Sequence, residues 1–192
     1  MTAAASQEQS YNESFLNQIV REIVIESSSS FFSQDVEEKA VEKEDDFVYG
    51  EVMSAILVHA TEFVTLLKFH YSYESVSKLL TAAGMVPEDG QPTVSDIEDS
   101  MNELANLAGG RIIENLGTRG IQCSLSIPVT TPGYDEILSS DLISTHEYRD
   151  YFVLHFGECA ITVTSSNKIK DASVEEYFKK QIETTRVESA FF

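Results

Sequence analysis

The spacing of hydrophobic and polar residues predicts both helices and strands along this chain. From Tyr11 onward, apolar residues recur at the spacing of an amphipathic helix, and a run of serines at 27–30 weakens the end of that helix. Residues 48–60 and 62–71 are rich in β-branched and aromatic side chains, and each segment is long enough to be a strand. The first half therefore predicts one helix followed by two paired strands.

The second half also contains both helices and strands. Its pattern predicts a short helix at 73–83 closed by Gly84, a loop at 86–93 and a long helix at 95–116. A strand at 121–128 ending at Pro128 and a turn-rich segment at 130–136 follow. Two strands at 151–156 and 158–165, joined near Gly157, and a last amphipathic helix at 172–187 complete the pattern. Strands joined as hairpins, with helices between the pairs, predict an α+β fold in which long helices cover an antiparallel-rich β-sheet.

The domain organisation follows from length and composition. A chain of 192 residues with 42% hydrophobic residues predicts one globular domain with appendages. We expect a disordered tail at 1–10, a domain at 11–170 and a C-terminal helical extension at 171–192. Seven acidic residues crowd into 35–46, which predicts a solvated connection with room for a charged strand start.

The long helix divides into two sides on a helical wheel. Its apolar residues collect on one side: Ile97, Met101, Leu104, Ala105, Ala108 and Ile112. Asp99, Glu103, Asn106 and Gly110 fall within about 60° of one another on the opposite side, in a line roughly 16 Å long. We call these four residues the polar ridge. The opening of this helix fits a capping box formed by Ser95 and Glu98.

The polar ridge is poorly optimised for a surface helix. Asp99 and Glu103 are like charges one turn apart, which costs about 0.2–0.5 kcal/mol where a salt bridge would stabilise the helix. Asn106 is a weak helix former, and Gly109 and Gly110 each cost about 1 kcal/mol relative to alanine. A solvated polar face remains the alternative, but together these features favour a recognition surface that another protein approaches closely.

Charge narrows the choice of partner. The sequence has 32 acidic and 13 basic residues, a formal charge of −19, so nucleic acid and anionic membranes are excluded as expected partners. The first ten residues have neither the basic nor the apolar region of a signal peptide, and no run approaches the roughly 18 apolar residues of a membrane span. We therefore expect a cytoplasmic protein.

Other chemistry finds little support in the sequence. Two cysteines lie in apolar, strand-like segments and four histidines are dispersed, so we expect no metal site from Cys123, Cys159, His59, His70, His146 or His155. Nucleotide-binding glycine motifs and a nucleophile elbow are missing from the sequence.

The polar ridge reads D-x-x-x-E-x-x-N-x-x-x-G, which resembles the signature of the CheC/CheX/FliY chemotaxis phosphatases. The surroundings resemble CheX in particular, because a single such motif follows the extended pair GEVMSAILVHA and EFVTLLKFHY. The stretch IPVTTPG at 127–133 is similar to the family's strand that ends in a proline, with a glycine five positions later. The resemblance runs from about Phe15 to Ser165 and implies the family's α+β fold.

The resemblance also implies an activity, which is hydrolysis of the phospho-aspartate on a CheY-type response regulator. Carried over by position, Asn106 would orient the attacking water and Glu103 would pair with the regulator's active-site lysine. Asp99 would help to dock the regulator, and Gly110 would leave room for its approach. This chain would bind no cofactor, because Mg²⁺ belongs to the regulator, and it would act as a homodimer. A non-catalytic domain that binds a response regulator or the flagellar switch is the alternative.

Overall fold

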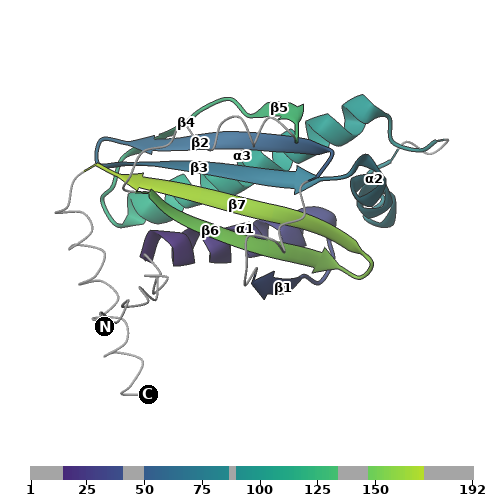
Figure 1. Ribbon diagram of the computed structural model, residues 1–192, viewed down its shortest axis with the longest axis horizontal. Coiled ribbons are helices and arrows are strands. Elements are labelled where there is room, and N and C mark those ends of the chain that lie inside the picture. Colours follow the sequence, from purple (N-terminus) through teal and green to yellow (C-terminus); the bar gives the residue numbers. More distant parts are fainter. Residues whose placement is uncertain (1–14, 41–49, 87–89, 134–146, 171–192) are drawn as a thin grey trace, which may run out of the picture.

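The computed structural model describes residues 15–40, 50–86, 90–133 and 147–170, which form one sheet and three helices (Figure 1). The elements in chain order are α1 Phe15–Phe32, β1 Glu37–Ala40, β2 Val52–Ala60, β3 Phe63–Tyr71, α2 Tyr73–Ala82, α3 Val94–Thr118, β4 Cys123–Leu125, β5 Val129–Pro132, β6 Glu147–Phe156 and β7 Cys159–Ile169. The expected tail at 1–10 and the expected helix at 172–187 lie outside the described residues.

The sheet is antiparallel throughout its described pairings. Its strand order is β1-β6-β7-β3-β2-β4, and β5 also pairs with β2. The hairpins β2–β3 and β6–β7 lie side by side through the β3–β7 pairing. Gly157 takes a φ of 61° in the β6–β7 turn, a left-handed conformation that glycine adopts without a steric penalty. The predicted α+β fold with an antiparallel-rich sheet is confirmed.

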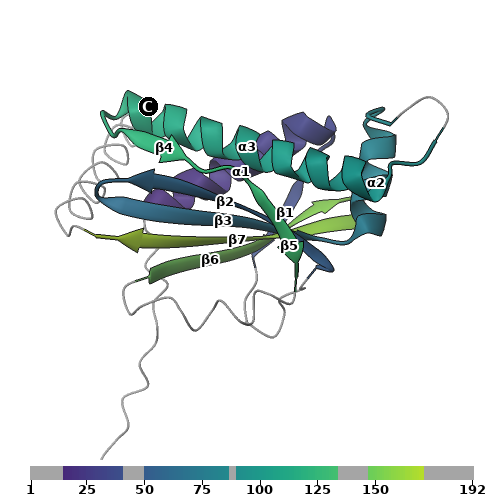
Figure 2. The same cartoon turned by 90° about the horizontal axis from the view of Figure 1, so that it is seen from above.

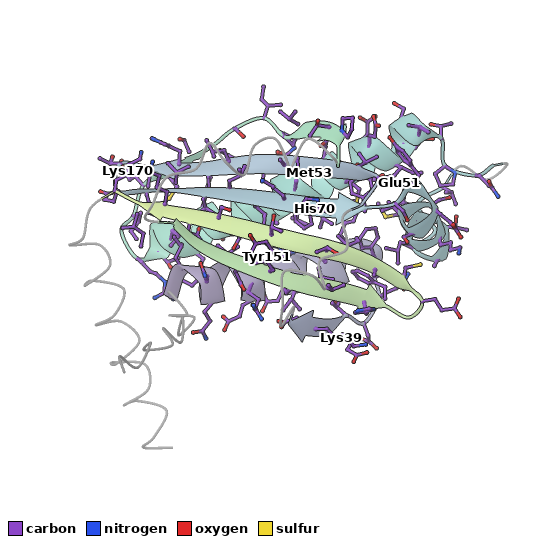
Figure 3. All side chains as sticks on the ribbon, in the orientation of Figure 1. Lys39, Glu51, Met53, His70, Tyr151 and Lys170 are labelled. Carbon is purple, nitrogen blue, oxygen red and sulfur yellow. The ribbon has the colours of Figure 1, made fainter. Side chains whose placement is uncertain are left out.

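Helices α1 and α3 cover one face of the sheet, and α2 lies near one end of it (Figure 2). Alternation along the strands sends Ile56, Leu67 and Val163 into this helical layer, where each is at most 1% exposed. Figure 3 views the opposite face, on which Met53, His70 and Tyr151 lie. The core that supports α3 is therefore the layer between the helices and the sheet.

The segment after α3 differs from the prediction. In place of one strand ending at Pro128, the chain forms two short strands, β4 and β5, and β5 occupies part of the expected turn-rich segment. Both pair with β2, and the register inserts one extra residue between them, since Leu125 faces Val58 whereas Val129 faces Ala55. The extra residue is a β-bulge. Strand β5 forms although its sequence is polar and contains a proline, because the backbone edge of β2 supplies its hydrogen-bond partners.

The serine run does not end the first helix. Helix α1 continues to Phe32, and Ser27 and Ser28 are completely buried. Arg111 of α3 donates a hydrogen bond from Nη1 to Ser27 Oγ at 3.3 Å. The small side chains thus lie within the packed layer, and packing of α1 on α3 overrides the weak helix propensity of serine.

One arginine connects α1 to β1 and β6, the two strands at one edge of the sheet. Arg21 donates from Nε to Asp150 Oδ2 of β6 at 2.9 Å and forms ion pairs with Asp150 and with Glu38 of β1. Its guanidinium carbon lies 4.9 Å from the centre of the Phe152 ring. The acidic segment therefore contains a strand, β1, whose charge is partly neutralised by α1.

Candidate functional site

Helix α3 begins with a capping box, at a different place from the predicted one. Thr93 is the N-cap: its Oγ1 accepts from Asp96 N at 3.2 Å, and Asp96 Oδ2 accepts from Thr93 N at 2.8 Å. Asp96 Oδ2 also accepts from the Thr93 hydroxyl at 2.7 Å, and this hydrogen bond, together with that from Thr93 N, holds the pKa of Asp96 below its usual value. The predicted pair, Ser95 and Glu98, is wrong because the helix starts earlier. Glu98 instead accepts a hydrogen bond from the Tyr73 hydroxyl of α2 at 2.7 Å.

The predicted apolar side of α3 is buried. All six residues assigned to it are at most 3% exposed: Ile97, Met101, Leu104, Ala105, Ala108 and Ile112. Leu116 continues the same face at the end of the helix and is completely buried. The inner side of α3 is therefore filled by core packing and leaves the outer side available for other contacts.

The structure brings the polar ridge together on the outer surface of α3. Asp99, Glu103, Asn106 and Gly110 are all exposed. Among the described residues, the side chains of Asp99, Glu103 and Asn106 make no hydrogen bond or ion pair. Glu103 and Asn106 are about 4.5 Å apart along the helix axis, given a rise of about 1.5 Å per residue. A carboxylate and an amide can thus face the same external group.

The two glycines of α3 have different surroundings. A Cβ on Gly109 would lie 2.6 Å from Leu125 Cδ1 of β4, so this glycine permits close packing of α3 on β4 within the chain. A Cβ on Gly110 would meet nothing within 4 Å. The described residues therefore give Gly109 a structural role and leave Gly110 without one.

Another side chain of α3, Asn102, was missed by sequence reasoning. It is half-buried beside the polar ridge, and its Oδ1 accepts a hydrogen bond from Thr130 Oγ1 of β5 at 3.0 Å. Thr130 in turn lies 3.3 Å from Ser54 Oγ, and Ser54 lies 3.2 Å from the Tyr71 hydroxyl. The sequence has no local signal for this contact, because it depends on the pairing of β5 with β2.

The described residues contain no group of three His, Cys, Asp or Glu side chains able to hold a metal ion. Cys159 is buried and Cys123 is half-buried, and burial raises the pKa of both thiols, which keeps them protonated at neutral pH. His70 is buried and His59 is exposed, whereas His146 lies outside the described residues. No helix within the described part of the chain is long and apolar enough to span a membrane.

The backbone around the IPVTTPG stretch is closely packed. Gly133 donates from its N–H to Glu51 O at 3.0 Å, and a Cβ on Gly133 would lie 2.0 Å from Gly50 O. A Cβ on Gly50 would likewise lie 2.2 Å from Tyr71 N. Glycine at 133 therefore allows the chain to leave β5 directly against the start of β2, which holds β5 and its Thr130 in place below α3.

Comparison with known proteins identifies the fold. No protein-family model and no curated protein matches the sequence. Among solved structures, a CheC-like chemotaxis protein from Shewanella oneidensis MR-1 matches with a TM-score of 0.63 at 14% identity, over 80% of this chain and 98% of that one. The chemotaxis protein CheX from Desulfovibrio desulfuricans matches with a TM-score of 0.58 at 12% identity, over 80% and 99% of the two chains.

A third neighbour was crystallised with a partner. It comes from a complex of CheX with CheY, BeF₃ and Mg²⁺ from Borrelia burgdorferi, and it matches with a TM-score of 0.57 at 9% identity, over 80% of this chain and 97% of that one. These identities are low, so the likeness concerns the fold. The chain has the α+β fold of the CheC-like and CheX chemotaxis proteins, as its sequence motif predicted.

Proposed function

We propose that this protein is a phosphatase that hydrolyses the phospho-aspartate of a CheY-type response regulator in chemotaxis or another two-component pathway. One observation carries the proposal: Glu103 and Asn106 are both exposed, one turn apart on α3, without a hydrogen-bond or ion-pair partner among the described residues. A neighbour of the same fold crystallised with CheY, BeF₃ and Mg²⁺ supports the choice of partner.

The chemistry needs little from this chain beyond positioning. In the proposed reaction a water oxygen attacks phosphorus, the bond from phosphorus to the aspartate oxygen breaks, and inorganic phosphate and a free carboxylate result. The amide of Asn106 would hold the water in line with the breaking bond, and Mg²⁺ in the regulator would offset the charge on the phosphoryl oxygens. An amide suits this role because it is neutral, whereas a carboxylate at the same position would repel the phosphoryl group.

The charges of the polar ridge suit a lysine-bearing partner. Glu103 would pair with the regulator's active-site lysine, and that pairing would bring Asn106 over the phosphoryl group. Asp99, one turn before Glu103, would add attraction at the edge of the contact, and Gly110 would leave room for the approaching backbone. The unpaired like charges of the free protein would then gain partners in the complex.

The proposal also includes the domain bounds, the oligomeric state and the cellular location. Residues 11–170 would form the phosphatase domain, and the protein would act as a homodimer in the cytoplasm. Sedimentation velocity of the full chain tests the dimer directly, because a monomer at micromolar concentration would reject it without touching the proposed reaction.

The decisive experiment mixes the purified protein with phosphorylated CheY-type regulators of its own cell in the presence of Mg²⁺. We expect the lifetime of the phospho-aspartate to shorten for at least one regulator. Asn106→Ala should lower the rate by about 10² or more, the scale of losing one preorganised polar group at a developing charge. Its affinity for the regulator loaded with BeF₃ should change little.

A matched control is Asn115→Ala, the same substitution further along α3, where Asn115 Oδ1 accepts a hydrogen bond from Arg119. This variant should keep the wild-type rate. Full activity of Asn106→Ala would reject the proposed mechanism. Stable binding of a regulator with no change in its lifetime would instead favour the alternative, a non-catalytic binding domain.

A further inference from the structure

A chain of hydrogen bonds runs from the core of the protein to the edge of the polar ridge. It joins the Tyr71 hydroxyl of β3 to Ser54 Oγ of β2 at 3.2 Å, Ser54 to Thr130 Oγ1 of β5 at 3.3 Å, and Thr130 to Asn102 Oδ1 of α3 at 3.0 Å. Its inner end is buried, since Tyr71 is 1% exposed and Ser54 is fully buried. Its outer end, Asn102, is half-buried beside Glu103.

Asn102 is the accepting end of this chain, because Thr130 Oγ1 donates to its Oδ1. With Thr130 donating to Asn102, every hydroxyl proton of the chain has an acceptor when Tyr71 donates to Ser54 and Ser54 donates to Thr130. Burial raises the pKa of Tyr71, so its hydroxyl stays protonated and keeps donating at neutral pH.

The direction of donation fixes the orientation of the Asn102 amide. Because Oδ1 is held by Thr130, the planar amide turns Nδ2 away from β5. Nδ2 has no acceptor among the described residues. Asn102 lies four residues before Asn106, so their Cβ atoms are neighbours about 5–6 Å apart, and the Asn106 side chain leans back toward the turn that carries Asn102.

We propose that Asn102 is a further regulator-binding residue, whose Nδ2 donates a hydrogen bond to an oxygen of the partner beside its phospho-aspartate. This inference rests on the proposed function and adds a group outside the D-x-x-x-E-x-x-N-x-x-x-G pattern. A solely structural role, in which Asn102 only fastens β5 to α3, needs Oδ1 and makes no use of Nδ2. The two roles therefore depend on different atoms of one side chain.

Asn102→Asp separates these atoms. It keeps an oxygen to accept from Thr130 and nearly the same shape, but it removes both N–H donors. We expect a melting temperature close to wild type and an affinity for the BeF₃-loaded regulator lowered about tenfold or more, the scale of a hydrogen bond to a charged or strongly polar acceptor. Asn115→Asp, about 20 Å further along the helix, introduces the same charge and should bind as wild type does.

Two further measurements identify the acceptor and exclude a charge effect. If Nδ2 contacts the phosphoryl group, Asn102→Asp loses affinity for the BeF₃-loaded regulator alone, whereas a protein acceptor predicts the same loss with the unloaded regulator. The loss of affinity should persist in 1 M salt, where interactions between charges more than about 3 Å apart are largely screened. Thr130→Val, which frees the amide to rotate, should weaken binding severalfold.

The possible outcomes decide between the inference and the proposed function. Wild-type affinity of Asn102→Asp overturns the inference and leaves the phosphatase proposal standing, and so does a loss of affinity that disappears in high salt. A wild-type protein that binds a regulator without hydrolysing its phospho-aspartate overturns the proposed reaction, and a weakened Asn102→Asp then still supports the binding role. A wild-type protein that binds no regulator overturns both.

Discussion

Gly110→Ala should make the protein more stable and less active at the same time. A Cβ at this position meets nothing within 4 Å, so alanine fits the free protein without any movement. Replacing glycine by alanine in a helix interior stabilises by about 0.4–1 kcal/mol, through helix propensity and the smaller entropy of the unfolded chain. For a chain of this size, 1 kcal/mol corresponds to a rise of roughly 2–4 °C in melting temperature.

The expected loss of activity comes from the partner's side of the contact. On the proposed function the regulator approaches α3 closely at Gly110, and an added methyl group would hold it away from Asn106. A displacement of about 1 Å can reduce a positioned reaction by about 10². The assays are thermal unfolding of the free protein and the rate of phospho-aspartate hydrolysis, both measured on the same preparation.

Gly117→Ala provides the matched control. It lies on the same helix about 10 Å further along, and a Cβ there also meets nothing within 4 Å. This variant should gain stability, less than Gly110→Ala because helix ends fray, and should keep the wild-type rate. A stabilised Gly110→Ala with wild-type activity would refute close approach at Gly110. An unstabilised variant would refute the view that the position is open.

Two further predictions concern the supports of the fold. Arg21→Met should lower the free energy of unfolding by about 2–3 kcal/mol, because the side chain of Asp150, 13% exposed, loses its ion-pair partner. In urea unfolding, adding Asp150→Asn should restore most of this loss. An unchanged midpoint for Arg21→Met would contradict the prediction. The hydrogen bond to Glu98, aided by burial, raises the pKa of Tyr73 from 10.0 to about 12, so its contribution to stability is complete below pH 10 and is lost as the pH rises toward 12. Alkaline absorbance titration should therefore show, besides the buried Tyr71, a late-ionising tyrosine that Glu98→Gln returns toward the ordinary value. An identical titration of both proteins would count against the contact.

The sequence predicted the division of α3 into two sides because amphipathic spacing reflects burial directly. The six residues placed on the apolar side are buried, and the polar ridge is exposed. The start of α3 was misplaced because Thr93 with Asp96 and Ser95 with Glu98 are both plausible capping pairs by type. In the structure Thr93 and Asp96 form the box, and Glu98 accepts a hydrogen bond from Tyr73 of a different helix, which the local sequence does not indicate.

Features that depend on partners distant in sequence could not be predicted. Strand β5 is short, polar and contains a proline, and it forms because β2 offers it a backbone edge. The orientation of Asn102 depends in turn on Thr130 of β5, which also contacts the buried Ser54. The serine run was expected to weaken the end of the first helix, because serine has a low helix propensity; the burial of Ser27 and Ser28 against α3, which keeps the helix intact to Phe32, is a tertiary effect.

The inner side of α3 has a consequence for how the outer side behaves in time. The same 25-residue helix supplies eight buried residues to the core and carries the whole polar ridge, so its backbone cannot open locally without exposing that core. Amide hydrogens in its central turns would then exchange with solvent only through global unfolding. A regulator would therefore meet a surface that is already ordered, and little of the binding free energy would be spent on ordering it.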